Sequence, residues 1–352
     1  MQRNLMDVLS EVLKVVKLQS AVFYNGEFSA PWSLRSPPSR TIAPYLAPEA
    51  EHVIIFHLLT EGRASVRLED GHHAVLGPGE IVVFPHGDPH IIENGSPADT
   101  VDLSQELDRI LGQGLKASRM GGGGDLTRFV CGYMVCDPRL SQVFLSGLPP
   151  LFKVRIRDDA SGGWLENSIR FSVNQAGMHH AGGEAVLARL SEVLIVETLR
   201  RYIGSLPPEQ TGWLAGARDS EVGRALALMH RNPAHPWTLA KLAGEVSVSR
   251  SVLAERFRHY LNESPIAYLT RWRLQLGGQM LSSTSYSVAR IAAEVGYESE
   301  AAFNRAFKRE FTIPPARFRS QSRSGSRDAG TATKSSAPKK EHRARLRNEP
   351  LG

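Results

Sequence analysis

The sequence predicts an α+β protein with two domains, a β-rich front part followed by an all-helical rear part. A chain of 352 residues is long enough to bury two separate cores. Up to about residue 180, short runs of β-branched and aromatic residues are divided by Gly, Pro and Asp. From about residue 183 to residue 319, apolar residues instead recur at helical spacing. We therefore expect strands first and helices afterwards.

The expected domain boundaries follow these changes of pattern. The front domain covers 1–182, and a helical linker, which is also a candidate dimerisation helix, covers 183–217. The helical domain covers 218–319. Residues 320–352 have no apolar periodicity and are expected to form a basic, disordered tail.

The net charge of +6 is distributed unevenly along the chain. Residues 1–216 carry a net charge of −5, residues 217–319 carry +6, and the remaining residues carry +5. A polyanionic partner is therefore expected for the rear part only. No apolar run approaches the ~20 residues that span a bilayer, and two cysteines do not make a disulfide framework. We expect a cytoplasmic protein without a membrane segment.

The elements of the front domain can be assigned in order. LMDVLSEVLKVVKL, from Leu5, has helical apolar spacing interrupted by Asp7 and Glu11, and predicts an amphipathic helix and not a signal peptide. HVIIFHLL, ASVRLED, HHAVLGPGEIVVFPHGDPHII and TRFVCGYMVC predict short strands of a sandwich or barrel. The run 112–125, with glycine at 121–124, predicts a mobile loop.

Three histidines of this domain, His57, His86 and His90, are candidates for an effector or metal site. A barrel brings distant strands together, and neutral imidazoles, with Glu61 as a further candidate ligand, suit zinc, nickel, copper or iron. HGDPH is also a good tight turn, because an Asp-Pro pair favours turn initiation. Structural or ligand-contacting histidines are therefore the alternative, and the sequence does not identify a metal.

Cys131 and Cys136 are candidates for redox sensing. In one unbroken strand, side chains five residues apart point to opposite faces, whereas a bend at Gly132 brings them nearer to each other. The alternative is a buried cysteine that acts as an inert small hydrophobic residue. The sequence does not decide whether either thiol is ionised.

The segment GGEAVLARLSEVLIVETLRRYIGSLPPE predicts a helix of about 20 residues that a Gly and a Pro-Pro pair end. Its apolar stripe consists of Leu187, Leu190, Val193, Leu194 and Leu199. This stripe is either part of the core of its own domain or a dimer contact, and both interpretations stay open.

The rear domain contains a sequence repeat with a period of about 50 residues. LAGEVSVSRSVLAERFRHYLNESP, from Leu242, aligns with IAAEVGYESEAAFNRAFKREFTIPP, from Ile291, with one extra residue in the second copy. Each copy has a short helix, a turn, a Ser that caps the next helix, and a second helix with one apolar face. This is the layout of a helix-turn-helix unit, whose second helix enters a major groove of DNA. The connecting stretch IAYLTRWRLQLGGQML would hold the two second helices about one DNA turn apart.

These residues resemble a known family. IAAEVGYESEAAFNRAFKREFTIPPARFR is similar, almost position by position, to the second helix-turn-helix of AraC/XylS-type transcription regulators. The resemblance covers Glu221 to Arg319 and implies a DNA-binding domain of seven helices. FHLLTEGRASVRLEDGHHAVLGPGEIVVFPHGDPHII resembles the cupin-like sensor domain of such regulators, which implies a small β-barrel that holds an effector. FHLL stands where enzymatic cupins have a His-X-His pair, so this part departs from the enzymes.

The resemblance also assigns base-reading positions. The first recognition helix offers Arg250, Ser251, Ala254 and Glu255, and the second offers Glu300, Ala301, Asn304 and Arg305. Arg reads guanine, Asn reads adenine, and Glu accepts from cytosine; Glu300 has the alternative role of stabilising its own helix N-terminus. The neighbouring Arg256, Arg258, Lys308 and Arg309 either contact phosphates or solvate the helices. A Gly-Gly pair at 277–278 replaces expected alanines, and at about 1 kcal/mol per residue it is expected to soften the connector.

The resulting prediction is a sequence-specific DNA-binding transcriptional regulator that responds to an effector through the front domain, and not an enzyme. Expected partners are promoter DNA, RNA polymerase, a small-molecule or oxidant effector and a second copy of the chain, and no cofactor is expected. One alternative is a metal-dependent cupin enzyme, an oxygenase or isomerase, with a helical appendage. Another is an architectural DNA binder that uses the basic tail. The effector, the operator, the target genes and the sign of regulation are not identified by the sequence.

Overall fold

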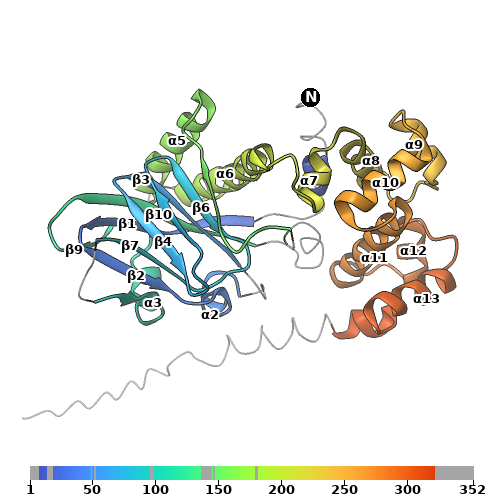
Figure 1. Ribbon diagram of the computed structural model, residues 1–352. Helices are drawn as coiled ribbons and strands as arrows, with labels where there is room; N and C mark the ends of the chain where they lie inside the picture. The colour runs from blue at the N-terminus through green and yellow to red at the C-terminus, as the bar shows by residue number, and fades with distance from the viewer. Residues whose placement is uncertain are drawn as a thin grey trace, which may run out of the picture.

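The computed structural model describes residues 8–13, 19–48, 50, 53–95, 99–135, 145, 147–178 and 181–321. Within these ranges, a front part built from two β-sheets and several helices is followed by a helical rear part (Figure 1). The predicted α+β class with two domains is confirmed, whereas the predicted boundaries remain predictions. Residues 315–321 are helical, and the rest of the predicted tail lies outside the described residues.

The front part contains a six-stranded and a five-stranded sheet. The six-stranded sheet has the order β11-β6-β3-β10-β1-β9, with β1 at Gln19–Ser29, β3 at Ile54–Glu61, β6 at Glu80–Phe84, β9 at Ser118–Gly121, β10 at Leu126–Val135 and β11 at Phe152–Arg155. The five-stranded sheet has the order β5-β4-β7-β2-β8, with β2 at Trp32–Ser36, β4 at Ala64–Leu68, β5 at His73–Leu76, β7 at His90–Asn94 and β8 at Val101–Asp102. The two sheets are not closed into one barrel, so the sandwich alternative describes them better.

Both faces of the six-stranded sheet are covered, which explains the continuous burial along β3 and β6. Successive residues of a strand point to opposite faces. Ile54, Phe56 and Leu58 belong to the apolar cluster that includes the helices, whereas Ile55 and Leu59 belong to the cluster between the two sheets. The position between them, His57, therefore faces the interior between the sheets.

The helices of the front part are α2 at Ser39–Leu46, α3 at Leu103–Gly112, α5 at Ala160–Gly177 and α6 at Gly183–Ser205. The predicted helix α6 packs on α5 and on β1. Leu187, Leu194 and Leu199 are buried in the core, whereas Val193 is exposed. The apolar stripe of α6 is therefore mainly a core element, as the first of the two interpretations proposed.

The glycine-rich run that predicted a mobile loop is partly a strand. Residues 118–121 form β9, which pairs in parallel with β1. The amides of Gly122 and Gly124 donate hydrogen bonds to the carbonyl oxygens of Ser29 and Ala30. Gly121 has a φ of 126°, and a Cβ there would lie 1.8 Å from the Ser29 oxygen, so only glycine fits. These glycines serve close backbone packing.

The rear part contains α7 at Trp213–Arg218, α8 at Ser220–Arg231, α9 at Leu239–Glu245, α10 at Arg250–Leu261, α11 at Pro265–Ser283, α12 at Val288–Glu294 and α13 at Glu300–Phe311. The helices α8 to α13 and the helical residues 315–321 make up the seven helices that the family resemblance implied. In Figure 1, α11 lies between α10 and α13.

The beginning of the described chain contacts the rear part and not the far end of the front part (Figure 1). Residues 8–13 are helical, as predicted, and Val8 and Val12 are buried. Glu11 is also buried, and its carboxylate forms an ion pair of 3.2 Å with Arg231 of α8. Across the ranges given above, no helix has the length and apolarity needed to cross a bilayer.

Candidate DNA-reading surface and sensor interior

The two halves of the sequence repeat fold into units with the same backbone hydrogen bonds. In the first turn, the amides of Ser247 and Val248 donate to the carbonyls of Gly244 and Ala243. In the second turn, residues 296 and 297 donate in the same way to residues 293 and 292. Ser247 and Gly296 occupy the same repeat position, and both have a left-handed backbone, with φ of 64° and 87°. The repeat is therefore a repeat of structure as well as of sequence.

Each recognition helix, α10 and α13, begins at a serine cap and is anchored by phenylalanine. The hydroxyl of Ser249 accepts from the amide of Val252, and the hydroxyl of Ser299 accepts from the amide of Ala302, each at 3.2 Å. The anchoring rings are fully buried: Phe257 in α10, and Phe303 and Phe307 in α13. This anchoring leaves the opposite face of each helix toward solvent.

All eight predicted base-reading residues lie on these solvent-accessible faces. Six are exposed: Arg250, Ser251, Glu255, Glu300, Ala301 and Arg305. The other two, Ala254 and Asn304, are half-buried. None of the eight points into the core of the domain. Their contact with DNA remains a prediction.

Arg256 of α10 forms ion pairs with residues of another helix. Its guanidinium forms ion pairs with Asp219, the N-cap residue of α8, and with Glu221 at 3.0 Å. The sequence suggested phosphate contact or solvation for this residue, and missed this role because the partners lie on another helix. Arg258, Lys308 and Arg309 are exposed and keep both suggested roles.

The glycine pair of the connector α11 has a packing role. A Cβ on Gly277 would lie 2.8 Å from the ring of Phe303, which is closer than carbon atoms pack. A Cβ on Gly278 would lie 3.4 Å from the ring of Phe318, which is ordinary contact. The sequence predicted a softened connector, but Gly277 instead allows α11 to approach α13 closely.

In the front part, the structure brings together His57, His90 and Cys131. Nε2 of His57 lies 2.7 Å from Nε2 of His90, and Nδ1 of His57 lies 2.7 Å from Sγ of Cys131. His57 and Cys131 are paired residues on β3 and β10 of one sheet, whereas His90 begins β7 of the other sheet. All three are buried, and the ring of Phe84 stacks on His90 at 3.6 Å.

The hydrogen bonds of this cluster fix the position of each proton. Nδ1 of His90 lies 2.9 Å from the carbonyl oxygen of Asp88, which can only accept, so this nitrogen carries a hydrogen. Neutral His90 then accepts at Nε2, and His57 must donate from its own Nε2. Nδ1 of His57 is therefore an acceptor, and the Cys131 thiol donates to it. The chain of hydrogen bonds is complete when all three side chains are neutral.

Burial favours these neutral forms. It lowers the pKa of His90 to about 4 and, with a further contribution from His90, lowers the pKa of His57 well below its ordinary value. Burial also raises the pKa of the Cys131 thiol well above its ordinary value. A neutral, buried thiol is a poor nucleophile. Cys136 lies outside the described residues, so the redox-sensing role of the two cysteines stays a prediction.

The three predicted histidines do not converge on one point. His57 and His90 use their facing nitrogens for each other, and Nε2 of His86 lies 3.0 Å from the carbonyl oxygen of Leu148. Glu61 pairs with Arg128 on the neighbouring strand. Throughout the described part of the chain, no three His, Cys, Asp or Glu side chains converge as ligands. The donor set therefore does not fit the metal centre of an enzymatic cupin.

A polar pocket of about 540 Å³ lies at the rim of the five-stranded sheet. Its lining includes Arg35 at the end of β2, Arg40 in the first turn of α2, and Glu69, which is 3.6 Å from Arg35. The loop 86–89 forms another wall. This loop also supplies the carbonyl that His90 contacts, so the pocket adjoins the buried cluster. The sequence analysis missed this pocket, since its lining comes from four separate segments, 35–40, 69, 86–89 and 102.

Comparison with known proteins agrees with this two-part architecture. Residues 7–204 match the family described as Cupin, and residues 242–321 match the family described as Helix-turn-helix domain. The chain is 28% identical over 319 residues to the HTH-type transcriptional regulator AlkR of Acinetobacter baylyi, which covers 90% of this chain and 100% of AlkR.

Two further proteins are similar, one over most of the chain and one over about a third of it. A putative AraC-like transcription regulator of Streptomyces lividans is 28% identical over 321 residues, which is 89% of this chain and 98% of the relative. A solved AraC-type regulator structure from Chromobacterium violaceum has 31% identity and a TM-score of 0.29, and covers 31% of this chain and 96% of its own. The chain therefore belongs to the AraC-type transcriptional regulators that join an N-terminal cupin domain to a C-terminal helix-turn-helix domain.

Proposed function

We propose that this DNA-binding regulator reads two successive major-groove segments of its operator with α10 and α13. The observation that supports this proposal is the repeated unit, because both helices bury a phenylalanine face and present the opposite face to solvent. The connector α11 packs against both units and would hold them at one fixed separation. The net charge of +6 on residues 217–319 favours a polyanionic partner.

Individual roles follow from the chemistry of the side chains. Arg250 and Arg305, both exposed, would donate two hydrogen bonds to guanine, and Asn304 would pair with adenine. Glu255 and Glu300 would be repelled by phosphate. We therefore expect them either to contact base edges or to weaken binding to DNA sequences other than the operator. Glu300 lies in the first turn of α13, where it also stabilises the helix.

The replacement Arg305→Ala tests the base-reading role. We expect binding to the preferred operator to weaken by about 1–3 kcal/mol and the preference for one base pair to disappear. Lys308→Ala on the same helix is the matched control, because a phosphate contact should weaken binding on every sequence and reduce the salt dependence. Binding to a library of operator variants, measured at several salt concentrations, separates the two. Equal loss on every sequence for Arg305→Ala would contradict base reading.

We further propose that the front domain binds a small polar effector and catalyses no reaction. The pocket beside loop 86–89 offers the space, and its charged lining suits a polar ligand. The histidines that an enzymatic cupin would use are instead occupied by each other, by Cys131 and by backbone carbonyls. RNA polymerase remains an expected partner, without assigned residues.

Metal analysis of the purified protein tests the enzyme alternative. We expect no stoichiometric zinc, nickel, copper or iron. A stoichiometric metal that is lost in His57→Gln, while the variant keeps its thermal stability, would support the enzyme instead. A second variant, in which residues 320–352 are deleted, tests the architectural alternative. We expect this variant to bind the operator, whereas a DNA binder that depends on the basic tail would lose binding.

A further inference from the structure

The two recognition helices differ at a position where the repeat should make them alike. At the offset of 50 residues that relates α10 to α13, Arg256 of α10 corresponds to Ala306 of α13. Arg256 forms ion pairs with Asp219 and, at 3.0 Å, with Glu221. The methyl group of Ala306 can form no such contact. The first recognition helix is therefore attached to a neighbouring helix by a charged contact that the second lacks at the equivalent position.

Asp219 lies at the corner between α7 and α8. As the N-cap residue of α8, its carboxylate accepts from the amides of Glu221 and Val222 at 3.1 and 2.9 Å. Its own amide donates to the carbonyl of Ala215 in α7. The side chain of Asp219 is only 6% exposed, and a buried carboxylate needs a compensating charge because its desolvation is costly. Arg256 supplies that charge, so the corner and the recognition helix α10 share one ion pair.

The helix α7 also packs directly on α10. The amide of Gly212, the N-cap residue of α7, donates to the carbonyl of Tyr260 in the last turn of α10 at 2.8 Å. A Cβ on Gly216 would lie 3.2 Å from the Cβ of Tyr260, so the two helices approach closely there. Arg256 lies one turn before Tyr260 on the same helix. The position of α10 is therefore determined largely by α7 and the corner that follows it.

On its other side, α7 contacts the last helix of the front part. The guanidinium of Arg218, the last residue of α7, donates to the carbonyl oxygen of Leu206, the C-cap residue of α6. Because Arg218 and Asp219 are consecutive, only two polar contacts separate the end of α6 from the recognition helix α10. A cavity of about 270 Å³ lies at this joint, and Leu206, Arg218, Asp219 and Arg256 belong to its lining. The joint therefore has space into which the corner can shift.

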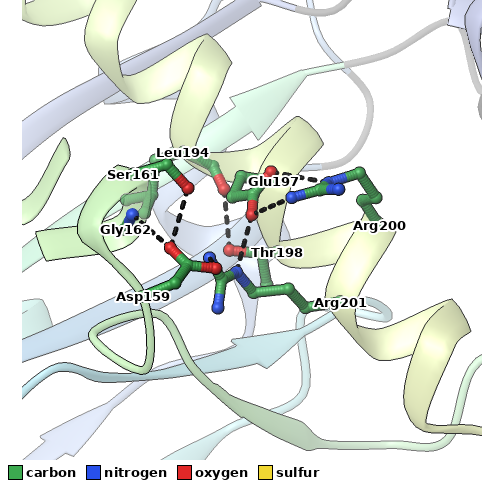
Figure 2. A network of polar contacts seen from close by, with 8 residues as sticks. All are labelled: Asp159, Ser161, Gly162, Leu194, Glu197, Thr198, Arg200 and Arg201. Carbon is green, nitrogen blue, oxygen red and sulfur yellow. Dashed lines mark hydrogen bonds and ion pairs between the residues drawn. The ribbon is translucent and has the colours of Figure 1, made fainter. Parts of the chain in front are cut away.

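A polar network attaches the end of α6 to the front part (Figure 2). The carboxylate of Asp159 caps α5 by accepting from the amide of Gly162 at 2.8 Å, and pairs with Arg201 of α6 at 2.7 Å. Arg201 also contacts Glu197, at 2.6 Å, on its own helix. Arg201 lies in the last turns of α6, which packs on α5 and β1. The carbonyl of Leu206 therefore moves together with the front part.

We propose that Arg256 and Asp219 are positioning residues that make the first reading helix, and not the second, depend on the position of the front part. This inference rests on the proposed reading of DNA by α10 and α13. A displacement of α6 moves the corner at Asp219, and the ion pair carries this displacement to α10. The helix α13 packs on α11 and α12, and it has alanine at the equivalent position. Base reading requires side chains held within about 0.5 Å, so a small displacement of α10 changes its discrimination between bases.

The variant Asp219→Asn tests the pair, because it removes the charge and keeps the cap: Asn caps a helix as well as Asp does. We expect base discrimination in the operator segment read by α10 to fall by about 10-fold, and discrimination in the segment read by α13 to stay unchanged. Arg256→Gln should have the same effect, whereas Arg256→Lys, which keeps the charge, should retain most of the discrimination. Arg189→Gln is the control, because Arg189 pairs with Glu192 within α6 and should affect neither segment.

Binding of the full chain to a library of operator variants measures this discrimination at each base pair. Arg250→Ala and Arg305→Ala identify, in the same library, the segments that α10 and α13 read. Full discrimination by Asp219→Asn, or an equal loss in both segments, would overturn the inference and leave the proposed function standing. A parent protein that discriminates in neither segment would contradict the proposed function and, with it, the inference.

Native-state hydrogen exchange tests the connection to the front part without DNA. We expect Arg218→Gln, which removes the contact with the Leu206 carbonyl, to accelerate amide exchange in α10 and to leave exchange in α13 as in the parent. Asp219→Asn should have the same effect on the two helices. Unchanged exchange in α10, or equal acceleration in both helices, would show that the front part does not act on α10 through this corner.

Discussion

The replacement Gly277→Ala has two opposing effects on the free energy of unfolding, and their sizes can be compared. Alanine is favoured over glycine inside a helix by about 1 kcal/mol. The new Cβ, however, would lie 2.8 Å from the ring of Phe303, which is fully buried and enclosed by Tyr297 and Phe307 at ring distances of 5.3 Å. Overpacking of this kind costs about 1–3 kcal/mol. We expect the clash to win, with a net loss of about 1 kcal/mol in the free energy of unfolding.

Gly278→Ala is the matched control one position along the same helix. Its Cβ would meet Phe318 at 3.4 Å, which is ordinary contact, so the gain of about 1 kcal/mol should appear with little opposition. Urea denaturation of the full chain, followed by helical circular dichroism, should separate the two midpoints by about 1 M. If Gly277→Ala is as stable as Gly278→Ala, the glycine does not serve close packing of α11 on α13, and the softened connector becomes the better explanation.

Two other predictions concern buried titratable groups. The pKa of His90 is lowered to about 4 by burial and that of His230 to about 3, so below pH 6.5 the unfolded chain binds protons that the folded chain does not. The free energy of unfolding should therefore fall as the pH decreases from 6.5, by about 3 kcal/mol for His90 alone by pH 4, and His90→Asn should reduce this slope in pH-dependent urea titrations. Burial raises the pKa of the Cys131 thiol, so in Cys136→Ser protein iodoacetamide should label Cys131 only after denaturation, and rapid labelling of the native protein would show that the thiol is accessible.

The rear domain could be predicted in detail because its information is local and appears twice. The serine caps, the turn position shared by Ser247 and Gly296, and the buried Phe257 and Phe307 follow from the order of residues along one short segment. A single helix-turn-helix pattern in a sequence is ambiguous, whereas the same pattern repeated about 50 residues later identifies the unit clearly. The fold class of both parts and the exposure of the recognition faces could therefore be predicted from the sequence.

The sensor interior was less accessible, because its contacts join residues far apart in the chain. Cys131 lies next to His57 through the pairing of β10 with β3, across 74 residues, and no local pattern sets that register. The helix α5 was also missed, since Gly162 and Gly163 weaken the helical pattern at its start. What stabilises this start is the Asp159 cap and its pair with Arg201, which only the tertiary structure reveals.

The ion pair between Glu11 and Arg231 has a consequence for how the two parts can move. Two domains that are joined only by a linker can rotate freely relative to each other. Here the rear part is connected to the front part at two places: α6 contacts α7, and the segment 8–13 contacts α8. A rotation of the rear part about the linker would require the segment 8–13 to separate from α8. We therefore expect a change that weakens the contact between residues 8–13 and α8 to increase the movement of the rear part relative to the front part.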